Sequence, residues 1–207
     1  MTDQPKVLLD DLTFPEGPRW HDGRLWFSDF YAHEVVAVDL SGKRETIVEV
    51  PGQPSGLGWT PDGRLLVVSM VDRKFLRLDP SGLVEVADLS ALAGYHCNDM
   101  VVDGDGSAYV GNFGYNSHGG DPFQTADLIR VDPEGATSVA ATGLAFPNGS
   151  VITPDGGTLI VGETRGHILS AWDRHPDGSL DNRRVWADLD GGYPDGICLD
   201  ADGAIWV

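Results

Sequence analysis

Short runs of alternating apolar and polar residues recur along the chain between glycine turns, and no long stretch has the spacing of a helix. An Asp-Gly pair lies between two such runs five times, beginning at Asp22, Asp62, Asp105, Asp155 and Asp202. Successive pairs are 40, 43, 50 and 47 residues apart. Asp-Gly between two strand-like runs predicts a β-hairpin in which both turn residues have positive φ. The pattern therefore predicts an all-β chain.

The same four-strand pattern surrounds each Asp-Gly pair. A first strand precedes the turn and a second follows it; a third strand and a second glycine turn then lead to an outer strand. Four antiparallel strands every 40 to 50 residues are typical of β-propeller blades, whereas a β-sandwich would not explain a fixed period. The predicted blade repeats cover about 14–53, 54–95, 96–145, 146–192 and, in part, 193–207.

Both ends of the chain bear on the number of blades. The fifth repeat stops at Val207 within a strand pattern, and residues 6–11 read as an outer strand with no earlier strand to pair with. We therefore expect residues 1–207 to be a single six-bladed propeller domain, truncated after about four and a half blades, with 6–11 in the last blade. Roughly 70–90 further residues would complete it. A natural ring of four or five blades is the alternative, but it would expose an unpaired edge.

Charge and cysteine content narrow the possible partners. The chain has 14 basic and 32 acidic residues, a formal charge of −18, which argues against nucleic acid or an anionic membrane surface as a partner. No apolar run is long enough to span a membrane. Cys97 and Cys198 lie far apart, which disfavours a disulfide framework and indicates free thiols in a reducing, cytoplasmic compartment. We expect a monomer or weak dimer.

Five residues hold equivalent places at the start of the predicted first strands, and we call these places the ring positions. They are Glu16, Ser55, Asn98, Asn148 and Asp195. Proline precedes four of them and glycine follows four, so the backbone is kept similar while the side chain varies. Because the first strand of a blade is innermost, these side chains should encircle one end of the central channel.

Four of the ring positions offer a carboxylate or amide oxygen. Such ligands suit a hard divalent cation, Ca²⁺ before Mg²⁺ or Mn²⁺, whereas Zn²⁺ is possible but usually recruits His or Cys. Facing carboxylates would repel each other unless a cation lay between them. The alternative is a polar channel filled with water.

Four motifs resemble the senescence marker protein (regucalcin)/gluconolactonase/luciferin-regenerating enzyme family. They are Phe14–Trp20, Asn98–Asp103, Pro147–Gly156 and Tyr193–Asp200. The resemblance covers nearly the whole chain and implies a six-bladed propeller that hydrolyses sugar lactones, with relatives that accept other lactones or organophosphate esters.

The resemblance also implies roles for particular residues. Glu16, Asn148 and Asp195 match the ligands of one divalent metal, and Asp195 matches the catalytic base or nucleophile. Asn98 matches an Asn that contacts substrate or the outer shell of the metal. Family sugar lactonases often have an Arg two residues before that Asn, where this chain has His96. The resemblance therefore favours lactone hydrolysis without defining the lactone.

The sequence thus predicts a metal-dependent lactonase in which the cation polarises the lactone carbonyl and Asp195 acts as base or nucleophile. Besides Asn98 and His96, we expect substrate contacts from His118 and Asp121 in the long loop 113–126, which forms either a lid or a mobile surface segment. Alternatives are a hydrolase of organophosphates or other esters, a calcium buffer, and a non-catalytic propeller that binds protein.

Overall fold

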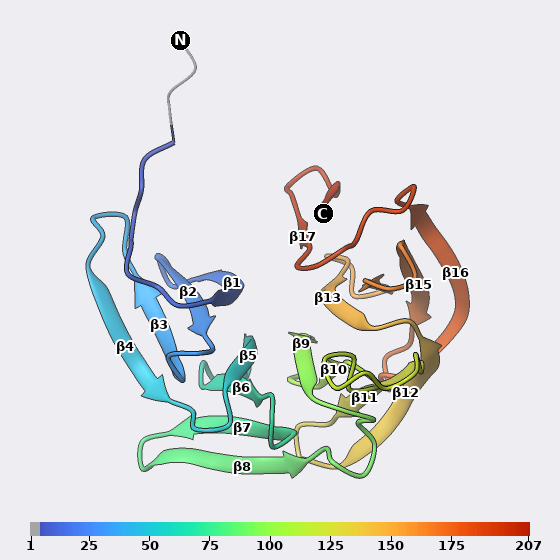
Figure 1. The fold of residues 1–207 in the computed structure, drawn as a ribbon, viewed down its shortest axis with the longest axis horizontal. Helices are drawn as coiled ribbons and strands as arrows, with labels where there is room; N and C mark the ends of the chain where they lie inside the picture. Colours follow the sequence, from blue (N-terminus) through green and yellow to red (C-terminus); the bar gives the residue numbers. More distant parts are fainter. Residues whose placement is uncertain (1–4) are drawn as a thin grey trace.

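The computed structural model describes residues 5–207, and in this range every regular element is a β-strand. Four antiparallel sheets of four strands are arranged around a central axis as an open arc (Figure 1). The predicted all-β propeller arrangement is therefore confirmed, while the number of six blades stays a prediction. Within residues 5–207, no helix is long and apolar enough to cross a membrane.

Each sheet is a blade made of four strands that are consecutive in sequence. Blade 1 consists of β1 (Pro15–His21), β2 (Arg24–Asp29), β3 (Glu34–Val38) and β4 (Arg44–Glu49). Blade 2 consists of β5 (Pro54–Trp59), β6 (Leu65–Ser69), β7 (Lys74–Asp79) and β8 (Gly82–Asp88). Blade 3 consists of β9 (Cys97–Val102), β10 (Ala108–Asn112), β11 (Ala126–Val131) and β12 (Thr137–Leu144).

Blade 4 is followed by one further hairpin. Blade 4 consists of β13 (Pro147–Ile152), β14 (Thr158–Glu163), β15 (Ile168–Arg174) and β16 (Leu180–Asp188). The hairpin pairs β17 (Cys198–Leu199) with β18 (Ile205–Trp206). Residues 6–11 form no strand, although Leu9 packs with Leu12 against the side of blade 1. Their assignment to a last blade stays a prediction.

The Asp-Gly turns have two forms. In blade 1 both Asp22 and Gly23 have positive φ, as expected. In the later turns only the glycine does; for example, Gly63 donates to the Thr60 carbonyl and Thr60 N–H donates to Arg64. The prediction of two positive φ values is therefore wrong for these turns. The turns at Asp62, Asp105 and Asp202 have one more loop residue than the turn at Asp22, and the turn at Asp155 has two more, so a residue with negative φ can precede the glycine.

The hydrophobic core lies between neighbouring blades. One cluster joins blades 1 and 2 around Val35 and Leu57, and a second joins blades 2 and 3 around Phe75 and Met100. Two more clusters join blade 3 to blade 4 and blade 4 to the β17–β18 hairpin. The innermost strands β1, β5, β9 and β13 are neighbours around the axis. This packing determines where the first residues of those strands lie.

Candidate functional site

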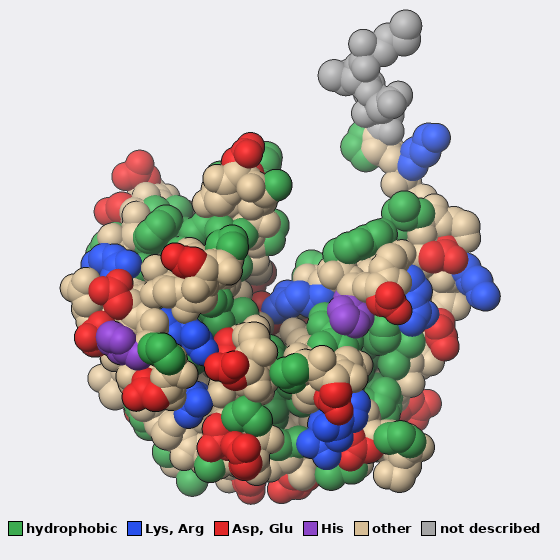
Figure 2. Space-filling model, turned by 180° about the vertical axis from the view of Figure 1, so that it is seen from behind, with side chains coloured by type: hydrophobic (Ala, Val, Ile, Leu, Met, Phe, Trp, Pro, Cys, Tyr) green, Lys and Arg blue, Asp and Glu red, His purple; other side chains and the backbone are tan. Residues whose placement is uncertain are grey.

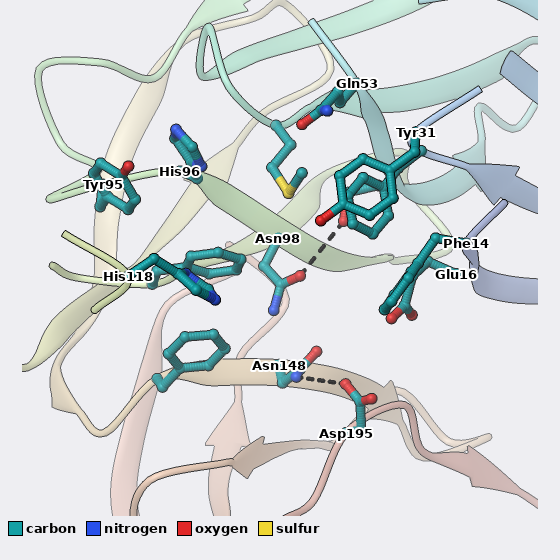
Figure 3. A pocket seen from close by; sticks show the side chains of 15 residues that line it. Phe14, Glu16, Tyr31, Gln53, Tyr95, His96, Asn98, His118, Asn148 and Asp195 are labelled. Carbon is teal, nitrogen blue, oxygen red and sulfur yellow. Dashed lines mark hydrogen bonds between the residues drawn. The ribbon is translucent and has the colours of Figure 1, made fainter. Parts of the chain in front are cut away.

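The ring positions meet at one end of the central channel. Glu16, Ser55, Asn98 and Asn148 are the second residues of β1, β5, β9 and β13, and Asp195 lies just before β17. All five line one cavity of about 480 Å³ (Figure 3). The Asp-Gly turns lie at the other end of the inner strands, so the repeat separates turn-forming aspartates from those of the cavity.

Glycine after a ring position lets neighbouring inner strands approach closely. Gly149 N–H donates to the Asp195 carbonyl at 3.0 Å, and a Cβ at Gly149 would lie 2.5 Å from that oxygen. A Cβ at Gly56 would lie 2.6 Å from the backbone nitrogen of Met100. A larger residue at either place would push adjacent blades apart. At Gly56 and Gly149 the glycine of the Pro-x-Gly pattern is thus a packing requirement, whereas in the described part of the chain no atom beyond the adjacent residues lies within 4 Å of a Cβ added at Gly196.

Asn148 and Asp195 are joined by a short network. Asn148 Nδ2 donates to Asp195 Oδ1 at 2.7 Å and to Thr164 Oγ1 at 3.1 Å. Thr164 Oγ1 in turn donates to the Pro194 carbonyl at 2.7 Å. Because both amide hydrogens of Asn148 are used, its carbonyl oxygen is directed into the cavity (Figure 3). The network orients oxygen atoms of two neighbouring blades toward the same space.

Negative charge gathers where Glu16 faces Asp195. Burial raises the pKa of the Glu16 carboxyl, and the charges of Asp195 and Asp99 raise it further, against a hydrogen bond from Gly17 N–H at 3.3 Å. The fifteen described residues that line the cavity include no Lys or Arg, and the nearby Arg19 pairs with Asp99 at 2.6 Å rather than with Glu16 or Asp195. A cation entering the cavity would favour the ionised form of both carboxylates.

The donor set fits a hard divalent cation. Glu16 and Asp195 supply carboxylate oxygens, and Asn148 supplies an amide carbonyl, which are the ligand types that Ca²⁺ prefers. In residues 5–207 no three side chains from His, Cys, Asp and Glu form a cluster that could hold a metal. Such clusters omit amide ligands, so the set with two carboxylates and one amide is compatible with this finding.

Of the expected substrate contacts, three line the cavity and one does not. Asn98 Oδ1 accepts from Ser55 Oγ at 3.4 Å, and His96 and His118 lie beside it (Figure 3). Burial lowers the pKa of His96, and the charges of Arg73 and His118 add to this shift. Asp121 is the exception, because its carboxylate is exposed and accepts from Asn116 N–H at 3.3 Å.

Sequence reasoning missed the apolar part of the cavity. Seven lining residues are aromatic or Met: Phe14, Phe30, Tyr31, Met70, Tyr95, Phe113 and Phe146. A signal for some of them was present, since an aromatic ring recurs two positions before a ring position. Phe14, His96 and Phe146 hold that place. Others follow the second strand of a blade, where no periodic pattern distinguishes them.

Comparison with known proteins shows the family to which the chain belongs. Residues 14–207 match the family model described as SMP-30/Gluconolactonase/LRE-like region. A gluconolactonase from Zymomonas mobilis is 25% identical over 98% of this chain and 66% of that enzyme. A strictosidine synthase-like protein from Arabidopsis thaliana is 34% identical over 40% of this chain. The chain spans 66% and 20% of the lengths of these two relatives.

Solved structures show the same architecture. A gluconolactonase from Xanthomonas campestris superimposes with a TM-score of 0.79 at 28% identity, covering 96% of this chain and 71% of that one. A regucalcin from Agrobacterium tumefaciens, described as calcium-binding, gives a TM-score of 0.81 at 24% identity, covering 97% and 69%. A luciferin-regenerating enzyme also gives 0.81, at 19% identity over 96% and 70%.

Proposed function

The chain belongs to the SMP-30/gluconolactonase/LRE-like family, and from this membership we propose that it is a divalent-metal-dependent hydrolase of lactones. The observation that carries the proposal is the convergence of Glu16, Asn148 and Asp195 at one end of the channel, with Asn148 hydrogen-bonded to Asp195 at 2.7 Å. Sugar lactones are the first class to consider, because two gluconolactonases are among its relatives.

Glu16, Asn148 and Asp195 would hold the cation, with Ca²⁺ as the first candidate. When bound, a divalent cation supplies Lewis-acid polarisation of a carbonyl and offsets the charge that develops on its oxygen. The two carboxylates and the amide oxygen of this chain keep the site negative enough to attract it. Asn98, beside Ser55, would orient the substrate or a water molecule.

In this proposal, Asp195 is the group that accepts a proton from the attacking water. The oxygen of water bonds to the lactone carbonyl carbon, Asp195 accepts a proton from that water, and the ring C–O bond breaks as its oxygen gains a proton. The product is a hydroxy acid. Direct attack by Asp195 on the carbonyl carbon, followed by hydrolysis of the acyl-enzyme, is the other route open to the same carboxylate.

A screen with and without metal tests the proposal. Proton release from glucono-δ-lactone, unsubstituted lactones and a fluorophosphate should be measured after EDTA treatment and after addition of Ca²⁺, Mg²⁺, Mn²⁺ or Zn²⁺. We expect lactone hydrolysis that EDTA abolishes and Ca²⁺ restores. Hydrolysis confined to the fluorophosphate would indicate an organophosphate hydrolase. Calcium binding by calorimetry without any hydrolysis would indicate a non-catalytic propeller.

A further inference from the structure

The cavity has a polar base and an apolar wall. The ring positions Glu16, Asn98, Asn148 and Asp195 form the base, whereas the seven aromatic and Met residues named above stand around it on the adjoining loops and strand ends (Figure 3). In the wall, Gln53, His96 and His118 offer polar side-chain atoms, and Tyr31 and Tyr95 each add one hydroxyl to an otherwise apolar ring. A ligand whose reacting group meets the base must therefore place its remaining atoms against mainly apolar surface.

One part of the wall is an aromatic cluster on blade 1. The ring of Phe14 lies 4.6 Å from that of Phe30 and 5.6 Å from that of Tyr31, with edge-to-face angles of 61° and 81°. The rings of Phe30 and Tyr31 are 4.2 Å apart. Since each ring supports the others, the cluster is a preformed surface. Phe14 and Tyr31 nevertheless remain 44% and 59% exposed, so apolar area is available for a ligand to cover.

A second aromatic cluster faces the base from blades 3 and 4. Phe113 and Phe146 stack with centroids 4.5 Å apart and an angle of 19°. The rings of Tyr95 and His96 stack at 4.0 Å. In Figure 3, Tyr95 and His118 lie on the opposite side of Asn98 from Phe14 and Tyr31. A flat group held above the base would thus have aromatic side chains on two sides.

Charge and hydrogen bonding also limit which ligands the cavity can bind. The lining has no Lys or Arg among the described residues, so a phosphate or carboxylate group on a ligand would find no cationic side chain to pair with. Hydroxyl groups placed against the phenyl rings would lose water without gaining a partner. Apolar substituents would instead remove both surfaces from water.

We propose that the preferred substrate is an uncharged lactone that carries a flat apolar substituent, such as an aryl ring, rather than a polyhydroxylated or phosphorylated lactone. This inference rests on the proposed lactonase function and names its substrate class. The carbonyl meets the polar base, and the substituent lies between the cluster of Phe14 and Tyr31 and the cluster of Phe113 and Phe146.

Matched lactones test the substrate class. We would measure kcat/KM for γ-butyrolactone and γ-phenyl-γ-butyrolactone, each corrected for its rate of alkaline hydrolysis, beside glucono-δ-lactone and its 6-phosphate. A gain of roughly tenfold or more from the phenyl group is expected. Equal or faster hydrolysis of the sugar lactone would overturn the inference while leaving the lactonase function in place. Failure to hydrolyse any lactone would instead contradict the proposed function.

Variants of Tyr31 test whether the aromatic wall causes the preference for the phenyl substituent. Because Tyr31 is 59% exposed, Tyr31→Ala should leave folding intact and reduce several-fold the preference for γ-phenyl-γ-butyrolactone over γ-butyrolactone. Tyr31→Phe should restore the preference. As a control, Trp186→Ala removes an aromatic ring on β16 that is 47% exposed and lies outside the cavity. It should leave kcat/KM unchanged for both lactones. An unchanged preference in Tyr31→Ala would show that the wall does not bind the substituent.

Discussion

At the ring positions the backbone is confined and the side chain alone differs from blade to blade. Glycine at 149 permits a contact of inner strands that no side chain could enter, and the same holds at Gly56. The preceding proline restricts φ, and in blade 3, where Cys97 takes its place, the Cys97 N–H donates to the Met70 carbonyl at 3.1 Å. The side chain at a ring position can therefore differ between blades, and change the chemistry of the cavity, without disturbing the sheets.

Asp195→Asn separates metal binding from proton transfer. An amide oxygen can still serve as a ligand and still accept from Asn148, but an amide cannot take the proton of water. We expect calcium affinity to fall modestly and kcat to fall by about 10²–10⁴-fold, measured by calorimetry and by steady-state hydrolysis. Asp202→Asn, in an exposed turn at the far end of the blades, is the control. Normal turnover in Asp195→Asn would remove this carboxylate from the mechanism.

The two cysteines should differ in reactivity. Burial raises the pKa of the Cys97 thiol to about 12, whereas Cys198 is exposed. Ellman's reagent should therefore modify one thiol in the native protein and two in urea, and Cys198→Ser should leave no thiol that reacts in the native state. Rapid modification of Cys97 in that variant would contradict its buried placement.

Alkaline pH should weaken the fold through the same thiol. In the unfolded chain Cys97 ionises near its ordinary pKa of 9.0, while in the folded chain it stays protonated to about 12. The unfolded state thus loses the proton first, and stability falls as pH rises from 9 toward 12. Between pH 8 and pH 10 this group should cost about 1 kcal/mol of unfolding free energy. Urea titrations should show a smaller decline in Cys97→Ala than in the parent protein.

The ring positions were accessible to sequence reasoning because the repeat placed them in register. Glu16, Asn98, Asn148 and Asp195 could be aligned by their distance from the Asp-Gly turns, and the structure brings them to one cavity. Tyr31 and Phe113 follow second strands, where loop geometry directs the side chain, so no period indicated them. Asp121 was predicted from its place in a long loop, but local bonds with Asn116 hold it outside the cavity.

At the scale of elements, the side chain that ends the second strand accepts hydrogen bonds from the backbone segment just before the first strand of the same blade. This is seen in blades 1, 3 and 4. Asp29 accepts hydrogen bonds from the backbone N–H groups of Thr13 and Phe14, just before β1. Asn112 Oδ1 accepts from Gly94 N–H, before β9. Glu163 accepts from Ala145 N–H at 2.7 Å, before β13. This anchor thus recurs in three blades, whereas in blade 2 the hydroxyl of Ser69, the last residue of β6, has no hydrogen-bond partner among residues 5–207.

Glu163 offers the sharpest test of the anchor. Its buried carboxylate also accepts from Ser170 and from Arg183, the latter at 2.7 Å. Glu163→Gln replaces one acceptor oxygen by a donor that faces other donors. We expect a loss of about 1–3 kcal/mol of unfolding free energy, measured by urea denaturation. Glu134→Gln, at an exposed turn, should change stability little.

The strands themselves were more predictable than their turns. The third strand of blade 1 was visible as the apolar run from Val35 to Val38 in β3. Val35 and Ala37 pack against blade 2, whereas Val36 and Val38 pack with Phe27 and with Leu9 and Leu12. Turn geometry depended on whether one or two residues precede the glycine, which an Asp-Gly pair alone does not define. The structure resolves this through the hydrogen bond from Gly63 to Thr60.

For the whole molecule, the formal charge of −18 sets the response to cations. Acidic side chains are spread over the face shown in Figure 2 rather than collected at one site. Added NaCl should screen their mutual repulsion and raise stability modestly. A specific ion in the cavity should add to that general effect.

Calcium should therefore raise the melting temperature more than NaCl of equal ionic strength. At about 100 times its Kd, a ligand of the folded state contributes about 2.7 kcal/mol, or roughly 5–10 °C for a chain of this size. Thermal melts of the parent protein and of the double variant Glu16→Gln with Asp195→Asn would measure the specific part. The proposed metal site would be refuted if both proteins gained equally from calcium.

Each of the four complete blades contains only strands that follow one another directly in the chain, and this has a consequence for synthesis. A blade can close its sheet once its own 40 to 50 residues have left the ribosome, without waiting for distant segments. The cavity, however, needs side chains from successive blades. A translating ribosome would thus carry well-formed sheets before Asn148 and Asp195 could come together in the cavity.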